Sequence, residues 1–156
     1  MAEARVAELS EAALVAWGER IGREAETPLV IALRGDLGAG KSTLARAIVH
    51  GTGVAGDVPS PTFNLLFRYD TPRGVTVHHL DLYRLEDPGE VWDLGWQELG
   101  AAGDVVLIEW PERAETMLPA TRWEVELEEA AGGELRRVAA TPVGAPPALP
   151  PMEGAR

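Results

Sequence analysis

The clearest chemistry in the sequence lies between Gly35 and Ser42. These residues read Gly-Asp-Leu-Gly-Ala-Gly-Lys-Ser and match the pattern G-x-x-x-x-G-K-[ST] of loops that bind nucleotide phosphates. In such loops the glycines let backbone N–H groups converge on phosphate oxygens, and the helix that follows adds the positive end of its dipole. The pattern therefore predicts a nucleotide site.

Lys41 is the only lysine among the 14 lysine and arginine residues of the chain. A compact ammonium on a flexible stem suits the β and γ phosphates better than the wide, planar guanidinium of arginine. This requirement explains a lysine at this position in a chain that otherwise uses arginine. The hydroxyl of Ser42 is then expected to bind Mg²⁺, which bridges the same phosphates.

Two carboxylates follow predicted strands and are candidates to complete the metal site. Asp81 follows "VTVHHL" and Glu109 follows "VVLI". In an open α/β sheet the carboxyl ends of neighbouring strands share one crevice with the loop, so either or both can reach the metal. Trp110 must lie near the nucleotide if Glu109 does. His78 and His79 should point to opposite faces of their strand, one packed and the other solvated.

The sequence favours ATP over GTP. The guanine-selective pattern N-K-x-D needs a lysine, but Lys41 is already used, and no D-x-x-G occurs. A stand-alone small-molecule kinase is an alternative, although it needs a lid and the connections after Gly51 are short. A nucleotide-binding scaffold without turnover is a third interpretation, because no catalytic base is assigned. Arg84 is the best internal candidate for an arginine that neutralises phosphate charge, with a structural salt bridge as the alternative.

Around these residues the chain predicts alternating strands and helices. "LVIAL" (residues 29–33) is an unbroken apolar run typical of a strand buried on both faces, and the loop after it opens a helix over residues 43–50. Ser10 fits the N-cap of an earlier helix with an apolar face of Leu14, Trp17 and Ile21. The remaining expected elements are two antiparallel strands within 62–83, a helix over 88–100, a buried strand at 104–110 and a hairpin from "TRWEVELEE" and "ELRRVAAT".

Together these elements predict one α/β domain over residues 1–141. We expect a P-loop NTPase-like fold with a mixed, mostly parallel sheet, flanked by helices and carrying antiparallel hairpins. Residues 142–156, "PVGAPPALPPMEGAR", contain five prolines and no periodicity, so they predict a flexible tail, with binding to a partner as the alternative.

Composition limits the kinds of function. The net charge of −11 opposes direct binding to nucleic acid or to an anionic membrane. The chain has no cysteine, which excludes thiol catalysis and Cys-based zinc sites, so any metal should be a hard ion bound through oxygen. No apolar run approaches the ~20 residues that span a bilayer, and a signal peptide is not evident, so a cytoplasmic protein is expected.

Four blocks of sequence, in this order and spacing, resemble the TsaE (YjeE) family of bacterial P-loop ATPases. They are "GDLGAGKST", "SPTF" (residues 60–63), "HLDLYRLEDPGE" (residues 79–90) and "IEWPER" (residues 108–113). The resemblance covers about residues 9–127. It implies the ATPase component of threonylcarbamoyladenosine synthesis next to the anticodon of tRNA, working with the TsaD and TsaB proteins. The tRNA would be handled only indirectly, through that assembly.

The resemblance also implies roles for individual residues. Ser42 and Glu109 would hold Mg²⁺, and Asp81 would be the Walker B-type acid. Thr62 would sit in a switch-like loop, and Trp110 would lie close to bound ATP. The residues expected to bind phosphates are Gly35, Asp36, Leu37, Gly38, Ala39, Gly40, Lys41, Ser42 and Thr43. Two features depart from the family pattern: a serine at position 42, where threonine is usual, and the proline-rich tail.

Overall fold

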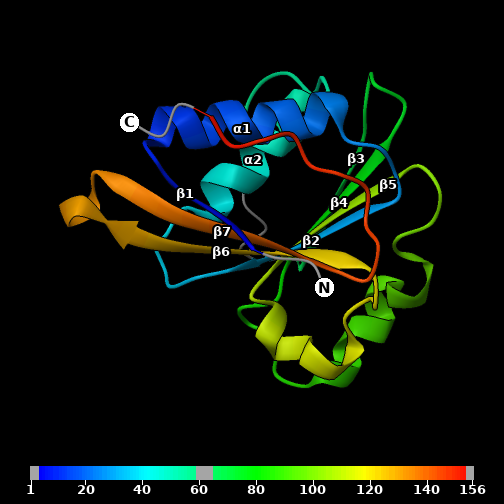
Figure 1. Ribbon diagram of the computed structural model, residues 1–156. Helices are drawn as coiled ribbons and strands as arrows, with labels where there is room; N and C mark the ends of the chain where they lie inside the picture. Colours follow the sequence, from blue (N-terminus) through cyan, green and yellow to red (C-terminus); the bar gives the residue numbers. More distant parts are fainter. Residues whose placement is uncertain (1–3, 59–64, 154–156) are drawn as a thin grey trace.

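A single mixed sheet forms the centre of the molecule (Figure 1). The computed structural model describes residues 4–58 and 65–153, and within these ranges seven strands are ordered β1-β7-β6-β2-β5-β4-β3. Strands β6, β2, β5 and β4 are parallel, whereas β3 at one edge and β7 and β1 at the other are antiparallel to their neighbours. This arrangement confirms the predicted sheet. The strands are β1 (Arg5–Leu9), β2 (Leu29–Arg34), β3 (Leu66–Asp70), β4 (Thr76–Asp81), β5 (Asp104–Glu109), β6 (Arg122–Ala130) and β7 (Leu135–Val143).

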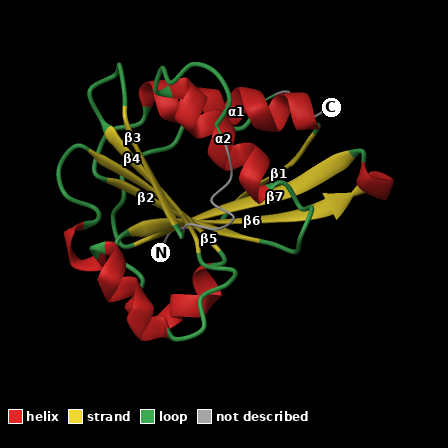
Figure 2. Cartoon of the chain, turned by 180° about the vertical axis from the view of Figure 1, so that it is seen from behind, coloured by secondary structure: helices red, strands yellow, loops and turns green. Residues whose placement is uncertain are grey.

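The two α-helices cover one face of the sheet, and the short 3₁₀ helices that lie between β4 and β6 in the chain cover the other, as Figures 1 and 2 show. The α-helices are α1 (Glu11–Glu24) and α2 (Lys41–Gly51); the 3₁₀ helices are η1 (Pro88–Leu94), η2 (Trp96–Glu98), η3 (Pro111–Met117) and η4 (Ala131–Gly133), the last of which joins β6 to β7. Alternate residues of the central strands enter the two cores: Leu107 packs beneath the α-helices, whereas Ile108 packs against the 3₁₀ helices. In the described ranges no helix is long and apolar enough to cross a membrane.

Helix α1 begins as predicted and fixes the position of α2. The Ser10 side chain caps α1 by accepting a hydrogen bond from the backbone N–H of Ala13 at 3.1 Å. Gly22 lets the two helices meet backbone to backbone, because a Cβ there would lie 2.1 Å from the carbonyl oxygen of Ile48. The close approach of α1 therefore sets where α2, and the loop at its start, lie against the sheet.

The prediction of one helix over residues 88–100 is wrong. A capping box between Asp87 and Glu90 starts the segment, with Pro88 at its first turn, but both helical pieces are 3₁₀ rather than α. Gly95 separates them in a left-handed conformation, with φ of 77°. Strand β1 and helix η3 were not predicted at all, since each is short and has no clear apolar periodicity.

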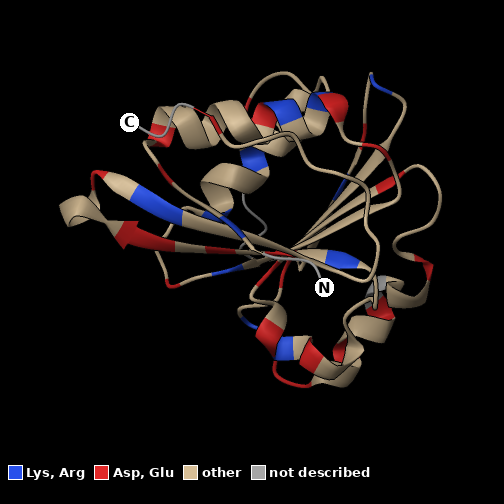
Figure 3. Cartoon of the chain, in the orientation of Figure 1, with Lys and Arg blue, Asp and Glu red and all other residues tan. Residues whose placement is uncertain are grey.

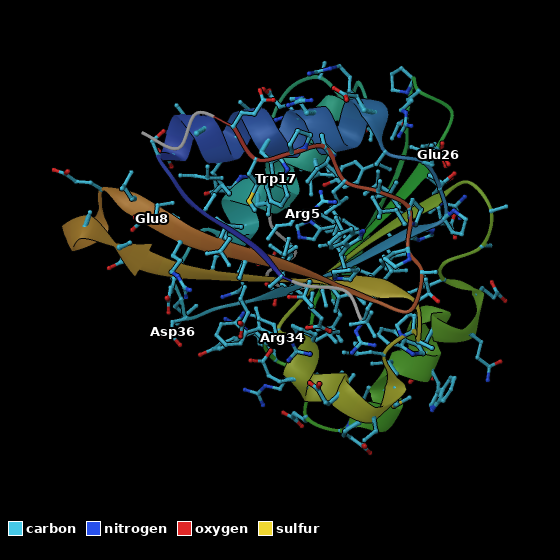
Figure 4. The ribbon with its side chains drawn as sticks, in the orientation of Figure 1. Arg5, Glu8, Trp17, Glu26, Arg34 and Asp36 are labelled. Carbon is cyan, nitrogen blue, oxygen red and sulfur yellow. The ribbon has the colours of Figure 1, made fainter. Side chains whose placement is uncertain are left out.

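The described part of the proline-rich segment lies against the domain, unlike the mobile tail expected from its composition. The indole N–H of Trp17 donates to the carbonyl of Pro150 at 2.8 Å, and that of Trp123 donates to the carbonyl of Pro147 at 2.7 Å. Leu149 is only 5% exposed. Figure 4 shows Trp17 on the side of α1 that faces the sheet, so this contact ties the segment to the main core.

Candidate functional site

The phosphate-loop sequence connects the end of β2 to the start of α2, as predicted. Gly35 has φ of 146°, and a Cβ there would lie 2.4 Å from the carbonyl oxygen of Leu127, so only glycine fits this turn. Gly40 occupies the N-cap of α2 and offers no side chain to the first turn. The N–H groups at the start of α2 are therefore available to an anion, with the positive end of the helix behind them.

The side chain of Lys41 is folded into this loop. It is 5% exposed, and its Nζ donates to the backbone carbonyls of Gly35 and Asp36, at 2.9 Å for the latter. Burial lowers the pKa of Lys41, while nearby carboxylates, Glu109 foremost, act in the opposite direction. The ammonium is therefore held inside the loop by the loop's own carbonyls.

Ser42 and Glu109 are brought together across the first turn of α2 and the end of β5. The hydroxyl of Ser42 donates to Oε1 of Glu109 at 2.9 Å. The other carboxylate oxygen, Oε2, lies 2.6 Å from Nε2 of His79, and both Glu109 and His79 are buried. His78 points to the opposite face, where its ring lies 3.3 Å from Asp104. The prediction that one histidine is packed is confirmed, whereas the prediction that the other is solvated is wrong, because the His78 side chain is only 12% exposed beside Asp104. The contact of His79 with Glu109 was missed because it depends on strand register.

Asp81 ends β4 directly beside Glu109 in the parallel register of β4 and β5. Its Oδ1 accepts a hydrogen bond from the backbone N–H of Tyr83 at 3.0 Å. Burial raises the pKa of Asp81 and the negative charge of Glu109 adds to the rise, while the Tyr83 N–H acts against it. Both candidate carboxylates thus reach the crevice at the carboxyl ends of adjacent strands.

The donor set fits a magnesium ion whose remaining ligands come from phosphates and water. Ser42, Asp81 and Glu109 offer only oxygen atoms, and Mg²⁺ is usually held by one or two carboxylates together with substrate phosphates. Among the described residues there is no cluster of three histidine, cysteine, aspartate or glutamate side chains that could hold a metal by itself. The site therefore suits a metal that arrives with a nucleotide.

A cavity of about 430 Å³ joins these groups. Its lining residues are Glu11, Leu14, Leu37, Gly38, Gly40, Lys41, Ser42, Thr43, Leu65, Asp81, Tyr83, Arg84, Glu109, Trp110 and Arg136. Arg84 is exposed and lines this cavity. Arg136 was not predicted; it reaches the cavity from β7 and lies 3.5 Å from the carbonyl of Gly38. Thr62 and the rest of the "SPTF" block lie outside the described residues.

Trp110 lies over the phosphate loop. Its backbone is left-handed, with φ of 58° and ψ of 50°, which is unusual for a bulky side chain and turns the chain sharply after β5. The indole packs against the Tyr83 ring, with 4.9 Å between the ring centres. Trp110 thus lies against the side chain of Lys41 in the loop, and its closeness to a nucleotide stays a prediction.

Comparison with known proteins gives a consistent family. The family model described as "Threonylcarbamoyl adenosine biosynthesis protein TsaE" matches residues 9–138. Two proteins named tRNA threonylcarbamoyladenosine biosynthesis protein TsaE are similar: that of Haemophilus influenzae is 42% identical over 94 residues, 60% of this chain, and that of Bacillus subtilis is 39% identical over 116 residues, 74% of this chain. The match spans 59% of the Haemophilus protein and 70% of the Bacillus protein.

A solved structure has the same fold. The crystal structure of Bacillus subtilis YdiB matches with a TM-score of 0.76 and 27% sequence identity. The match covers 92% of this chain and 88% of YdiB, so the likeness extends over nearly the whole fold.

Proposed function

The chain belongs to the TsaE family, and from that premise we propose that it is the ATP-binding and ATP-hydrolysing subunit required for threonylcarbamoyladenosine modification of tRNA. The single observation that carries the ATPase part is the arrangement of the phosphate loop. Lys41 points into the loop, and the Ser42 hydroxyl that follows it is already bonded to the buried carboxylate of Glu109. A loop that served only as a turn would need neither a buried lysine nor a carboxylate behind its serine.

Each group has a distinct task in this proposal. The N–H groups from Asp36 to Thr43 and the Lys41 ammonium bind the phosphates and hold the terminal phosphate in line for attack. Ser42, Glu109 and Asp81 would hold Mg²⁺, which would neutralise negative charge on the bound phosphates. Trp110 closes one side of the cavity and limits the entry of water.

Hydrolysis by the chain alone is proposed to be slow. P-loop hydrolysis needs a group that orients water and often an arginine that neutralises developing charge, and an arginine supplied by a partner raises the rate by roughly a thousandfold or more. Arg84 is the internal candidate for the arginine because it lines the cavity beside Asp81 and Tyr83. We propose that TsaD and TsaB complete the site when they bind.

The charge of the chain supports an indirect role toward tRNA. The net charge is −11, and Figure 3 shows acidic residues spread over the helices, the sheet and the connections. Such a surface repels a phosphate backbone unless a partner provides the basic contacts. We therefore propose that the other proteins of the assembly, rather than this chain, make the contacts to tRNA.

Turnover assays separate this function from the alternatives. ATP hydrolysis should rise when TsaD and TsaB are added, and tRNA modification by the three proteins should require hydrolysable ATP. Equal turnover with and without the partners, at concentrations where they bind, would contradict a site completed by partners. Phosphate transfer to a small-molecule acceptor in their absence would favour the stand-alone kinase instead.

A further inference from the structure

His79 contacts Glu109, the proposed metal-binding carboxylate, from the buried side of the site. The side chain is 0% exposed, and its Nε2 lies 2.6 Å from Oε2 of Glu109. We propose that His79 is a positioning residue: its Nε2–H holds Oε2 of Glu109, so that Oε1 is directed at Ser42 and at the metal. This inference rests on the proposed function, since it assigns how that site is pre-arranged before nucleotide arrives.

The sheet register explains how His79 reaches Glu109. Strands β4 and β5 are parallel, with Asp81 opposite Glu109 and His79 opposite Leu107. Residues two positions apart on a strand point to the same face, so His79 and Asp81 both lie on the face of β4 that α2 covers. His79 lies two residues before Asp81 and is therefore farther from the carboxyl end of the strand. Strand β4 thus supplies the Asp81 carboxylate to the crevice and also the His79 donor for Glu109 of β5.

The hydrogen bonding of the ring favours one tautomer. In the described part of the chain, Nδ1 of His79 is buried without a hydrogen-bond partner. A neutral ring protonated at Nε2 leaves only an acceptor unpaired at Nδ1, whereas a proton on Nδ1 would leave a buried N–H donor unpaired, which native structures rarely tolerate. The bond to Glu109 is therefore the ring's single polar contact among the described residues.

A histidine that merely fills the core would have different consequences. The same face of the sheet is otherwise packed with apolar side chains, including Val77 and Leu107. An apolar side chain of similar size would pack there as well as the histidine ring does. A role through Glu109 instead predicts that metal affinity depends on the donor at this position rather than on its volume, as for donors behind metal ligands in general.

Two variants of similar length separate these roles. His79→Gln keeps an N–H donor near the position of Nε2, whereas His79→Met keeps the volume and removes the donor. With ADP bound, His79→Met should raise the Mg²⁺ concentration for half-saturation by about tenfold or more, and His79→Gln by much less. Affinity for ADP in the presence of a chelator should stay the same in both. His78→Gln, on the other face of β4, is the control and should leave both affinities unchanged.

Calorimetry of Mg²⁺ binding to the ADP complex provides the readout. Equal Mg²⁺ affinity in His79→Met and wild type, or an equal loss in both His79 variants, would overturn the inference. A wild-type protein whose ADP complex does not bind Mg²⁺ would instead overturn the proposed function. If His79→Met does not fold, ¹⁵N NMR of the wild-type histidines decides: a proton on Nε2 of His79 supports the inference, and an Nε2 without a proton refutes it.

Discussion

The ammonium of Lys41 lies 4.0 Å from the centre of the Trp110 ring. This distance is well within the range of cation–π attraction. The same Nζ is bonded to two loop carbonyls, so the cation is held between its own loop and an indole that follows Glu109 directly. Phosphates entering the loop must replace these partners. Binding should therefore change the surroundings of both side chains at once.

Replacing Lys41 should abolish tight ATP binding. Lys41→Ala removes the only ammonium side chain of the cavity and should weaken ATP affinity by tenfold or more, which corresponds to at least about 1.4 kcal/mol. Lys41→Arg should also bind poorly, because a planar guanidinium does not fit the place of a point charge. Calorimetry measures the affinity, and circular dichroism checks the fold. Wild-type affinity and turnover in Lys41→Ala would rule out the phosphate-loop assignment.

Trp110 should report nucleotide binding through its fluorescence. Bound phosphates alter the charge next to the indole, so adding ATP to the wild type should change the emission, and Trp110→Phe should lose most of that change. Trp92→Phe is the matched control, since Trp92 is 51% exposed and does not line the cavity. An unchanged wild-type spectrum at saturating ATP would place Trp110 away from the nucleotide.

Removing either carboxylate should raise the requirement for Mg²⁺. Glu109→Ala should have the larger effect, because Glu109 is bonded to Ser42 whereas Asp81 is held by the Tyr83 backbone. The measurement is the Mg²⁺ dependence of ATP hydrolysis. Glu98→Ala, an exposed carboxylate on η2, provides the comparison and should not alter it. If the Mg²⁺ dependence of both site variants matched the wild type, these carboxylates would have no part in metal binding.

Glu124 should make the stability depend on pH in acid. Burial alone would raise its pKa, but hydrogen bonds from Arg34 and Arg122 outweigh this and lower the pKa below its usual value near 4.5. A lowered folded-state pKa gives stability that is present above the unfolded pKa and lost as pH falls through the folded pKa. Glu124→Gln should thus cost about 1–3 kcal/mol at pH 7, and the difference should shrink below pH 4.5. Urea unfolding at several pH values measures it; a constant difference would contradict the prediction.

Leu149 tests whether the proline-rich segment is packed in solution. The side chain is 5% exposed in the main core, so Leu149→Ala should lower the free energy of unfolding by about 2 kcal/mol or more. Ala148→Ser, next to it and exposed, should stay within about 0.5 kcal/mol. Urea unfolding compares the two. A similar, small effect of both substitutions would mean that the segment does not pack on the domain.

The sequence predicted those parts of the fold that local patterns determine. The unbroken apolar run of β2, the Ser10 cap of α1 and the glycine pattern before Lys41 each depend on neighbouring residues alone, and the structure has each of them. The sheet order also agreed with the expected class. Asp81 and Glu109 could be placed together because parallel strands end at one edge.

The features that sequence reasoning missed depend on partners far along the chain. The bond from His79 to Glu109 requires the register of β4 and β5, and Arg136 reaches the phosphate loop only because β7 lies near it. The packing of the proline-rich segment could not be predicted from apolar periodicity, because two of its contacts use the backbone carbonyls of Pro147 and Pro150 rather than a repeating apolar face. In the segment after Pro88, the left-handed Gly95 interrupts the segment that was predicted as one helix.

The pairing of β1 with β7 has a consequence for synthesis of the chain. In the described sheet β1 is an edge strand whose partner is β7, with Arg5 opposite Ala140 and Leu9 opposite Arg136. Contacts between such distant residues form late, because a long loop must close before they are made. On the ribosome, β1 emerges before the other strands of the described sheet and stays unpaired until β7 has been translated. A nascent chain stalled before Leu135 would carry both β1 and β6 with open edges, and would be a substrate for chaperones or for aggregation.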